Sequence, residues 1–508
     1  MLAKVHSVGL IGLEGFPIEI EVDIGGGLPQ FSIVGLPDAT VRESRDRVRS
    51  ALKNSGFHFP AKKITVNLAP ADKKKEGAGL DLGIALGILV AEGVLHQEAI
   101  LSYVFVGELA LDGRIKSVPG ALSMAMAIQA PQSLMLPHDN AAQAAVVERT
   151  RVYGVQTLPE VVEFIKGAHH LQPTRPDTDG IPPLLSIIDE DFADVVGQFQ
   201  AKRALEVAAA GGHNLLMIGP PGSGKTMLAQ RLTGILSPMA FQECLEASQI
   251  HSVAGTLSPQ SPLLTARPFR APHHTISEAG LVGGGPVPRP GEVSLAHHGV
   301  LFLDEALEFK RTLLDSLRQP LENGTVTLTR AQASLTFPAQ IMLVLAMNPC
   351  PCGYFGDATH ECLCTPHQIR RYRSRLSGPL LDRLDIHIEV PAVPVNDLSR
   401  GTGNEQSHII RERVIRARTR QLERYREDHI LYNARLKPKQ IKKYCQVKAA
   451  GKALLDQAVS RLGLSARAYG RILRVARTIA DLEPADMIEA NHVAEAIQYR
   501  ALDRPLSP

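Results

Sequence analysis

The segment GPPGSGKT, residues 219–226, has the residue types and spacing of a phosphate-binding loop. It fits the pattern G-x-x-x-x-G-K-[ST], and the apolar run before it and the helix-favouring residues after it predict a strand, a loop and a helix. Backbone N–H groups and the helix N-terminus would then surround a phosphate. We expect Lys225 to reach the β- and γ-phosphates of a nucleotide, and the hydroxyl of Thr226 to bind Mg²⁺. The rest of the expected loop is Gly219, Pro220, Pro221, Gly222, Ser223 and Gly224.

Two carboxylates stand at the end of a second apolar run, GVLFLDEA at 299–306. Asp304 would complete the Mg²⁺ shell, and Glu305 would orient and polarise an attacking water. The alternative is that both acids only cap the next helix. A third apolar run, 339–347, ends at Asn348, whose amide could position the same water. Strands that alternate with helices and deliver polar residues at their carboxyl ends indicate an α/β fold, a parallel sheet with a nucleotide at its edge.

Four of the six cysteines lie in the segment NPCPCGYFGDATHECLCTP, residues 348–366. Cys350 and Cys352 form one close pair and Cys362 and Cys364 a second, and four thiolates can enclose a structural Zn²⁺ ion. Free or redox-active thiols and an iron–sulfur cluster are the alternatives, and His360 or His367 could replace one ligand. We expect the metal to staple a loop that begins directly after Asn348, and so to hold geometry rather than perform chemistry.

The elements that must position these residues belong to an ordinary globular chain. Its 508 residues are 44% hydrophobic and 5% aromatic, enough for two to four domains with cores of their own. The start of the chain lacks the features of a signal peptide, and the longest apolar stretch, 80–94, is interrupted by acids and glycines. We therefore expect a cytoplasmic protein with no membrane partner. The net charge of +3 means that nucleic-acid binding would rest on local basic clusters.

The chain divides by pattern into three parts and a linker. Residues 1–168 mix strand patterns, at 18–23, 31–35, 63–68 and 103–111, with helices, and predict an α+β domain. One helix is expected from Ala39 to Asn54, with Asp38 as its N-cap. Four prolines and several acids predict an exposed linker at 169–191. The core with the phosphate loop follows at 192–395, and a charged, helical part at 396–508.

The chain resembles the YifB/ComM family of magnesium-chelatase-like AAA+ ATPases from Met1 to about Arg500. The stretches that carry the resemblance include KEGAGLDL, DVVGQFQAKRALEVAAAGGHNLLMIGPPGSGKT, RPFRAPHHTISEAGLVGGG, PGEVSLAHHGVLFLDEALEF, the cysteine segment, SGPLLDRLD and SARAYGRILRVARTIADL. Ala306 and Leu307 depart mildly from the family pattern. The resemblance implies an ATP-hydrolysing AAA+ core with a helical lid, whose last helices, 464–482 and 491–501, would lie over the nucleotide, with Ser465 capping the first.

The resemblance also implies roles for two arginines. Arg383, in LLDRLD, resembles the arginine finger that enters a neighbouring subunit's site, which implies a homo-oligomeric ring such as a hexamer. Arg467, in SARAY, is similar to the second sensor on the γ-phosphate, with Arg471 as the fallback. The alternative for Arg383 is a surface arginine paired with Asp382 or Asp385.

Two insertions relative to a minimal nucleotide-binding core bear on DNA. The first spans about 251–293; the second, 321–337, alternates like two strands about a turn, with Arg330 near its tip. In relatives such insertions project into a central pore, where a basic tip can follow a DNA backbone. The alternative is a surface hairpin in a contact between subunits. The paired histidines at 273–274 and 297–298 lack an acid or cysteine at ligand spacing, which disfavours a metal there.

Two stretches of the amino-terminal part are KEGAGLDLGIALGIL and VGELALDGRIKSVPGALSMA. They resemble the proteolytic domain of Lon proteases, an architecture of the ribosomal S5 domain 2 type. Lon hydrolysis relies on a serine and a lysine, and the corresponding places here are Gly79 and Leu122. The dyad is therefore absent, and a scaffold or nucleic-acid-binding role is expected. For Asp81 and Lys116, the polar residues nearby, we expect a salt bridge or a solvated pair.

Three functions remain open. The resemblance favours a DNA-translocating ring motor that promotes branch migration of single-stranded or branched DNA during natural transformation or recombination. The second is an ATPase subunit of a metal-chelatase or cofactor-assembly complex, and the third a Lon-like protease or unfoldase. Fold alone does not separate the first two.

Overall fold

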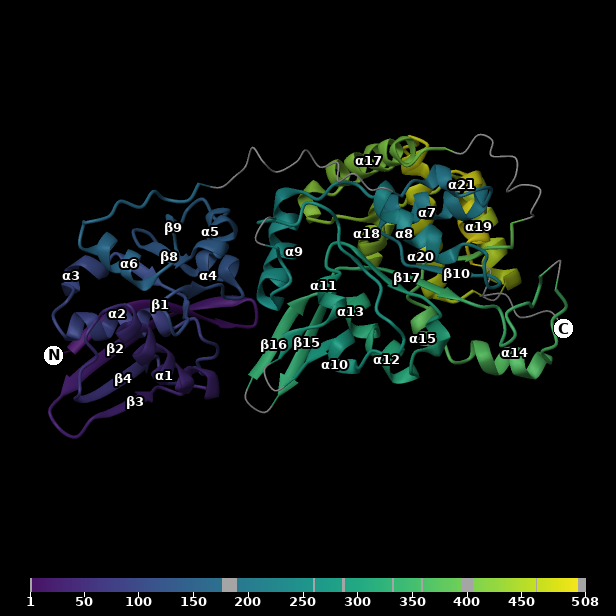
Figure 1. The fold of residues 1–508 in the computed structure, drawn as a ribbon. Helices are drawn as coiled ribbons and strands as arrows, with labels where there is room; N and C mark the ends of the chain where they lie inside the picture. The colour runs from purple at the N-terminus through teal and green to yellow at the C-terminus, as the bar shows by residue number, and fades with distance from the viewer. Residues whose placement is uncertain are drawn as a thin grey trace. The chain divides into compact units, whose positions relative to one another are not determined.

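The computed structural model in Figure 1 describes residues 2–175, 190–258, 261–285, 288–330, 333–357, 360–393, 405–462 and 464–500. The chain forms two compact units, each built from several segments. The first comprises residues 1–182, 241–264 and 329–337; the second comprises residues 183–240, 265–328 and 338–508. Most of the expected linker, residues 176–189, lies outside the described residues. No described helix combines the length and the apolar character needed to cross a bilayer.

The first unit is built on a seven-stranded mixed sheet in the order β3-β4-β2-β1-β5-β8-β9. Its long central hairpin pairs Leu2 with Asp23 and Ile11 with Glu14. Alternate residues of β2 point into the core, as a period of two requires. The strands are β1 (Leu2–Ile11), β2 (Glu14–Gly25), β3 (Gln30–Val34), β4 (Lys63–Ala69), β5 (Tyr103–Phe105), β8 (Ser133–Pro137) and β9 (Val152–Val155), and a separate pair is β6 (Glu108–Leu109) with β7 (Ile115–Lys116).

The expected strand at 103–111 is broken where the chain passes the start of α2. Gly107 lies between β5 and β6, and its carbonyl accepts a hydrogen bond from the amide of Leu82, at 3.1 Å. Gly107 also donates from its own amide to the carbonyl of Gly79, at 2.8 Å. These bonds to the α2 region replace ladder bonds, so one continuous strand does not form.

The helices of the first unit pack on this sheet. The helix expected at Ala39 to Asn54 is confirmed, and the side chain of Asp38 accepts from the amide of Val41. Helix α2 is apolar on every side and buried along its whole length, because it lies between the sheet and other helices. The helices are α1 (Ala39–Asn54), α2 (Asp81–Ala91), α3 (Gln97–Ile100), α4 (Ala121–Ala127), α5 (His138–Ala145), α6 (Leu158–Ile165) and, from far along the chain, α9 (Phe241–Ala254).

Helix α9 is attached to the amino-terminal unit by specific bonds. Gln249 donates from Nε2 to the carbonyl of Leu13 at 2.9 Å, and Gly120 donates from its amide to the carbonyl of Ser252 at 2.9 Å. The hydroxyl of Ser252 lies 2.9 Å from the amide oxygen of Gln143. The start of the first expected insertion, near residue 251, thus packs within the amino-terminal unit.

The second unit has a five-stranded parallel sheet in the order β11-β14-β17-β10-β18. The apolar runs expected to be strands before the phosphate loop, the two acids and Asn348 form β10, β14 and β17, each fully buried. Leu216 pairs with Leu345 and Leu303 pairs with the same residue from the other side, so the three strands end at one edge. The strands are β10 (Leu215–Ile218), β11 (Phe269–Arg270), β14 (Val300–Leu303), β17 (Met342–Met347) and β18 (Ile386–Glu389).

Helices surround this sheet, and Figure 1 shows α17 and α20 near α7 and α8. The helix cap expected at Ser465 is confirmed, because its hydroxyl accepts from the amide of Ala468. The helices are α7 (Phe199–Gly211), α8 (Lys225–Ile235), α10 (Glu278–Leu281), α11 (Glu292–Leu295), α12 (Arg311–Ser316), α13 (Arg318–Asn323), α14 (Pro366–Arg373), α15 (Gly378–Leu381), α17 (Ser407–Arg424), α18 (Pro438–Tyr444), α19 (Ala449–Leu462), α20 (Ala466–Leu482) and α21 (Ala490–Gln498).

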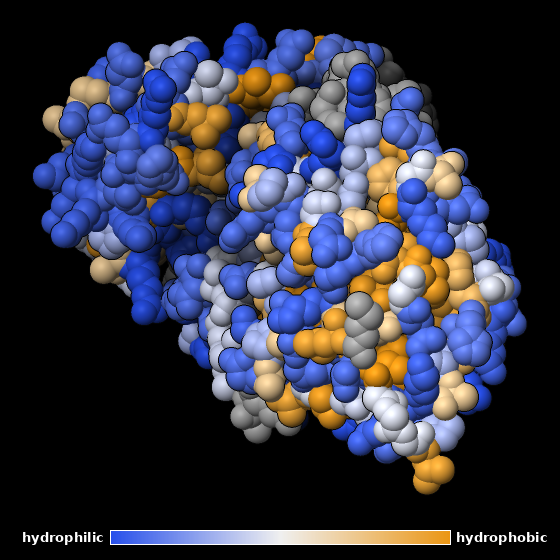
Figure 2. Space-filling view, turned by 90° about the vertical axis from the view of Figure 1, so that its left-hand side faces the viewer, coloured by the Kyte–Doolittle hydropathy of each residue, from blue (hydrophilic) through white to orange (hydrophobic). Residues whose placement is uncertain are grey.

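Two short antiparallel pairs complete the described elements. The expected hairpin is confirmed as β15 (Thr325–Arg330) with β16 (Ala333–Pro338), and the other pair is β12 (Gly283–Gly284) with β13 (Arg289–Pro290). Figure 2 shows one face of the molecule, on which apolar side chains lie among hydrophilic ones. Scattered exposed apolar residues of this kind are normal on protein surfaces, and no docking site follows from them.

Candidate nucleotide site and cysteine cluster

The phosphate loop, residues 219–226, connects the carboxyl end of β10 to α8. Gly222 and Gly224 have φ angles of +75° and +87°, which bend the loop, and an added Cβ at either would meet open space. Gly219 is required for a different reason, because a Cβ there would lie 2.1 Å from the carbonyl oxygen of Val390. Between them, Ser223 donates from its amide to the carbonyl of Pro220 at 3.3 Å. The loop therefore keeps an open side on which backbone amides can meet a phosphate.

Lys225 is buried at the base of this loop. Its Nζ donates to the carbonyl oxygens of Gly219 and Pro220, at 2.7 and 2.8 Å. Burial lowers the pKa of Lys225, and the charges of Asp304 and Glu305 partly offset this effect. The neutral carbonyls are weak partners for an ammonium group, so a phosphate oxygen would be a better one.

The side chains of Thr226, in the loop and helix after β10, and Asp304, after β14, meet at the end of the sheet. The hydroxyl of Thr226 donates to Oδ2 of Asp304 at 2.6 Å, and β17 separates β10 from β14 in the sheet. A hydroxyl and a carboxylate at this spacing match the protein ligands that Mg²⁺ takes beside a nucleotide. The two expected Mg²⁺ ligands are thus brought together, although they are 78 residues apart.

Glu305 has an unusual backbone conformation and an exposed carboxylate. Its φ is +47°, and its amide donates to Oδ1 of Asp304 at 2.9 Å. The side chain is 61% exposed, and its Oε2 lies 4.0 Å from Nδ1 of His274. A positive φ in a non-glycine residue is strained and is often found at functional sites. The reading of both acids as simple helix caps is not supported, since Glu305 makes no side-chain cap bond.

Asn348 follows β17 at the same edge of the sheet. The preceding residue, Met347, pairs with Ile218 and accepts from the amide of Gly219 at 3.2 Å. Asn348 is half-buried and follows β17, which lies between β10, the strand before the loop with Lys225, and β14, the strand before Glu305. The three expected water- and phosphate-handling residues therefore share one edge.

Arg383 and Arg467 lie at the other end of this sheet. The carbonyl of Arg383 accepts from Nδ2 of Asn214 at 3.0 Å, just before β10 begins, and its guanidinium pairs with Glu322. Arg467 pairs with Asp382 at 3.4 Å. Because the phosphate loop follows the last residue of β10, neither arginine is near Lys225 of its own chain. The helix α20, expected to lie over the nucleotide, therefore does not lie over the phosphate loop of its own chain.

Both arginines line one cavity of about 820 Å³. Asp385 holds the fallback residue, Arg471, at 2.5 Å; burial raises the pKa of Asp385, but the charge of Arg471 and a hydrogen bond from His213 outweigh it and hold that pKa well below its usual range. Among the described residues, the buried Nε atoms of Arg383, Arg471 and Arg474 have no hydrogen-bond partner. The basic residues of the cavity are Arg383, Arg435, Lys437, Lys442, Lys452, Arg467, Arg471 and Arg474, against the acids Glu322, Asp382 and Asp385.

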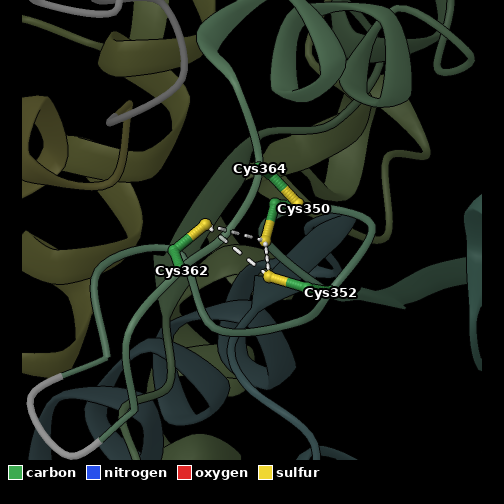
Figure 3. Close-up of side chains that lie close together, drawn as sticks. All are labelled: Cys350, Cys352, Cys362 and Cys364. Carbon is green, nitrogen blue, oxygen red and sulfur yellow. Dashed lines mark hydrogen bonds between the residues drawn. The ribbon is translucent and has the colours of Figure 1, made fainter.

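The four clustered cysteines converge in the second unit. Figure 3 shows the sulfur atoms of Cys350, Cys352 and Cys362 directed at one another, with Cys364 beside Cys350. The sulfur of Cys350 lies 3.3 Å from the sulfur of Cys352 and 3.7 Å from that of Cys362, and all four sulfurs lie within 4.8 Å of one another. All four are free thiols. A Zn–S bond of about 2.3 Å in a tetrahedron separates sulfurs by about 3.8 Å, so the cluster could hold such an ion with little movement.

Local hydrogen bonds favour a thiolate at Cys352 in this cluster. Phe355 donates from its amide to Sγ of Cys350 at 3.3 Å. A backbone hydrogen bond from Tyr354 is the main cause that lowers the pKa of Cys352 to about 6. At Cys362, a backbone hydrogen bond lowers the pKa, but burial and hydrogen bonds with the sulfurs of Cys352 and Cys350 outweigh it and raise the pKa to about 12. Burial raises the pKa of Cys364 as well. Soft, deprotonated sulfur ligands in a set of four are typical of a closed structural zinc site.

The side chain of one expected site residue lies outside the described structure, and the residues singled out in the Lon-like part have structural roles. Arg330 ends β15, and its side chain lies outside the described part of the structure. Asp81, in the amino-terminal unit, is fully buried, bonded to the hydroxyl of Ser44 and paired with Arg47 at 2.7 Å. It forms the expected salt bridge, but with Arg47, while Lys116 is exposed. Leu122, in the place of the Lon lysine, is a fully buried core residue.

Sequence reasoning missed two features of the site. The paired histidines in the sequence raise only the question of a metal site, yet His274 lies beside Glu305 and edge-on to Phe309, with 6.4 Å between ring centroids. The contact of Gly353 with the phosphate loop had no signal in the sequence beyond a glycine after Cys352. A Cβ on Gly353 would lie 2.8 Å from the ring of Pro221.

The parallel sheet order, the phosphate loop after β10 and the two acids after β14 define a P-loop ATPase of the AAA+ class. Family models described as "Magnesium chelatase, subunit ChlI", "Subunit ChlI of Mg-chelatase" and "Magnesium chelatase, subunit ChlI C-terminal" match residues 191–398, 20–140 and 404–500. The chain is 47% identical over 507 residues to "Uncharacterized protein YifB" of Salmonella typhimurium, covering 99% of this chain and 98% of the relative. It is 46% identical over 519 residues to "Competence protein ComM" of Haemophilus influenzae, again covering 99% and 98%.

The chain therefore belongs to the YifB/ComM family of magnesium-chelatase-like AAA+ proteins. Part of the chain has a second likeness, 30% identity over 151 residues to "Lon protease 2" of Bacillus subtilis, which covers 28% of this chain and 27% of that protein. The expected AAA+ core and partial Lon likeness are both confirmed. Membership of this AAA+ family implies an ATPase that uses Mg²⁺.

Proposed function

We propose that the protein is an ATP-hydrolysing ring motor, with six subunits expected, that translocates on single-stranded or branched DNA and promotes branch migration in natural transformation or recombination. The observation that carries the ring is the separation of Lys225 from Arg383 and Arg467 at opposite ends of β10. A nucleotide on one chain can meet these arginines only if a second copy supplies them. The unpartnered Nε of Arg383 and the excess of basic residues in its cavity suit the phosphates of such a nucleotide.

The residues at the phosphate-loop edge have distinct tasks in hydrolysis. Lys225 would exchange its two carbonyl partners for phosphate oxygens, and Thr226 with Asp304 would hold Mg²⁺, which neutralises charge on the phosphates when bound. Glu305 would accept the proton of the attacking water, and Asn348 would orient that water. From the neighbouring chain, Arg383 would stabilise the charge that develops on the transferred group, and Arg467 would sense it.

One relative and two basic features of the chain support DNA as the polymer along which the protein moves. The relative named "Competence protein ComM" aligns over nearly the whole chain. Arg330 stands at the end of β15, next to the hairpin turn. The helix α14 ends in a basic turn with Arg370, Arg371 and Arg373. A basic hairpin tip in a ring could follow a phosphodiester backbone without reading sequence.

Zn²⁺ is the ion we propose for the four cysteines. The chemistry of the donor set supports it, because four thiolates at nearly tetrahedral spacing prefer a soft d¹⁰ ion. With all four positions filled by sulfur, the ion would have a structural task. We also propose that the Lon-like part acts as a scaffold or nucleic-acid-binding element, since the places of the Lon serine and lysine hold Gly79 and the buried Leu122.

The second candidate, an ATPase subunit of a metal-chelatase complex, is favoured by the family models that match the chain. The two candidates differ in what stimulates hydrolysis. A motor responds to DNA, whereas a chelatase subunit responds to a protein partner.

ATP hydrolysis with and without single-stranded and branched DNA, at two salt concentrations, tests the proposal. We expect stimulation that weakens at the higher salt concentration, because binding to a DNA backbone releases counterions. Arg330→Ala should reduce the stimulation, while Arg461→Ala, an exposed arginine on α19, should not. Hydrolysis that is indifferent to every DNA would refute the motor and favour the chelatase candidate.

A further inference from the structure

The cysteine cluster is in direct contact with the phosphate loop. Gly353 follows Cys352 and has a φ of +89°. A Cβ built on it would lie 2.8 and 2.9 Å from Cδ and Cγ of Pro221. Real Cβ atoms do not approach so closely, so the main chain of Gly353 rests on the ring of Pro221 and leaves no space between them.

The same loop fixes its own position through Cys350. This residue is fully buried and stands two positions after Asn348. Its carbonyl accepts from the amide of Gly353 at 3.0 Å, and its sulfur accepts from the amide of Phe355 at 3.3 Å. An ion that binds the sulfur of Cys350 would therefore restrain Asn348 on one side and Gly353 on the other.

A third connection leads toward Arg383. Helix α14 begins two residues after Cys364, with Thr365 as the N-cap of a capping box. Arg373 of this helix donates from Nε to the carbonyl of Pro349 at 3.0 Å. Its guanidinium also lies 5.5 Å from the centroid of the Phe355 ring. Movement of the cysteine loop would therefore also move α14 and the segment that continues through α15 to Arg383.

We propose that Zn²⁺ bound by Cys350, Cys352, Cys362 and Cys364 sets the affinity of the phosphate loop for ATP, because the closed cluster holds Gly353 against Pro221. The inference rests on the proposed ATP site and assigns it a form of regulation, control by metal occupancy. Binding of a structural ion stabilises the ordered conformation of the loop that binds it. Without the ion, the four sulfurs within 4.8 Å of one another would no longer be joined through a metal, and the hydrogen bonds to Cys350 alone would support the loop under Pro221 less firmly.

A pair of glycine variants separates the contact from the metal. Gly353→Ala and Gly356→Ala both put a Cβ on a residue with positive φ, +89° and +81°, so both carry similar backbone strain. Only the first meets Pro221; the second meets nothing within 4 Å. We expect Gly353→Ala to keep its metal and to bind a fluorescent ATP analogue about 10- to 100-fold more weakly, the cost of displacing a binding loop by about 1 Å. Equal affinities for the two variants would overturn the proposal.

The metal itself is tested on the full chain by removal and by substitution. Metal content is measured by mass spectrometry, and binding of the ATP analogue is measured before and after treatment with a zinc-selective chelator that leaves Mg²⁺ in place. The double variant Cys362→Ser/Cys364→Ser should lose both metal and affinity, whereas Leu363→Ser, an 84% exposed residue between them, should lose neither. If the double variant does not fold, the chelated wild-type protein carries the test, and re-addition of Zn²⁺ should restore binding.

The outcomes also separate this inference from the proposed function. Unchanged nucleotide binding after the metal is removed, or wild-type protein purified without any metal, would refute the inference alone. Failure of the zinc-loaded wild-type protein to bind the nucleotide would refute the ATP site and the inference with it. Since no DNA is present in these measurements, a failure of DNA stimulation leaves their result intact.

Discussion

Subunit mixing tests whether Arg383 acts on the nucleotide of a neighbouring chain. Asn214, which contacts the carbonyl of Arg383, is separated from Gly219 by the length of β10, about 16 Å for five residues of extended chain. Arg383 therefore cannot serve the phosphate loop of its own chain. Arg383→Ala retains the phosphate loop, and Lys225→Ala retains the arginine, so each variant lacks what the other supplies.

The expected magnitude follows from this arrangement. Either variant alone should hydrolyse ATP at least about 1000-fold more slowly than the wild type, the usual contribution of an arginine finger. In a 1:1 co-expressed mixture, half of the sites have an intact loop and half of these face an intact arginine. If chains assort at random in the ring, the mixture should recover about a quarter of the wild-type rate.

The assay is steady-state ATP hydrolysis by rings purified through two tags, one on each variant. The matched control mixes Arg383→Ala with the double variant Lys225→Ala/Arg383→Ala, which supplies neither part and should not restore activity. A mixture that stays as inactive as its two components would refute the reasoning that the site is shared between chains.

Three further predictions concern chemistry and stability. Glu305→Gln should slow hydrolysis by about 100-fold or more while the affinity for ATP, measured with a fluorescent analogue, stays near wild type, because the carboxylate acts on the water; an equal loss of affinity would contradict this role. Burial holds the pKa of His387 well below its usual value, so below about pH 6.5 the unfolded chain takes up a proton that the folded chain does not. The free energy of unfolding should therefore fall, through this residue, by up to about 1.4 kcal/mol for each pH unit of acidification. Urea unfolding at several pH values should show a shallower loss in His387→Leu than in the wild type or in the surface variant His408→Leu, and equal slopes would contradict the assignment. Asp38→Ala should destabilise the amino-terminal unit by about 1 kcal/mol through the lost N-cap, and the exposed Asp46→Ala on the same helix should not; equal unfolding midpoints would count against it.

The features that the sequence predicted well are those decided by local chemistry. Asp38 before an amphipathic run marked the start of α1, and an apolar run before a glycine-rich loop marked β10 and α8. The acids and Asn348 could be placed together because parallel strands end at one edge. In each case the residue types of a short segment are enough to predict the local backbone geometry.

The features that could not be predicted depend on how distant segments pack. The position of Arg467 is set by the docking of α20, which the residues of SARAY alone do not determine. The attachment of α9 to the amino-terminal unit rests on bonds such as that from Gln249 to Leu13, 236 residues away. The contact between Gly353 and Pro221 arises because two loops meet at the same strand edge. Such contacts between distant residues leave no periodicity or spacing in the sequence.

The most direct test of the central claim is branch migration of a synthetic four-way DNA junction whose arms are homologous. Labelled products are followed with the wild-type protein and with Glu305→Gln, in ATP and in a non-hydrolysable analogue. We predict strand products only with the wild-type protein in ATP, at a rate that falls as salt is raised. Junctions that stay intact under wild-type protein that is actively hydrolysing ATP, or that migrate equally well with Glu305→Gln, would contradict an ATP-driven DNA motor.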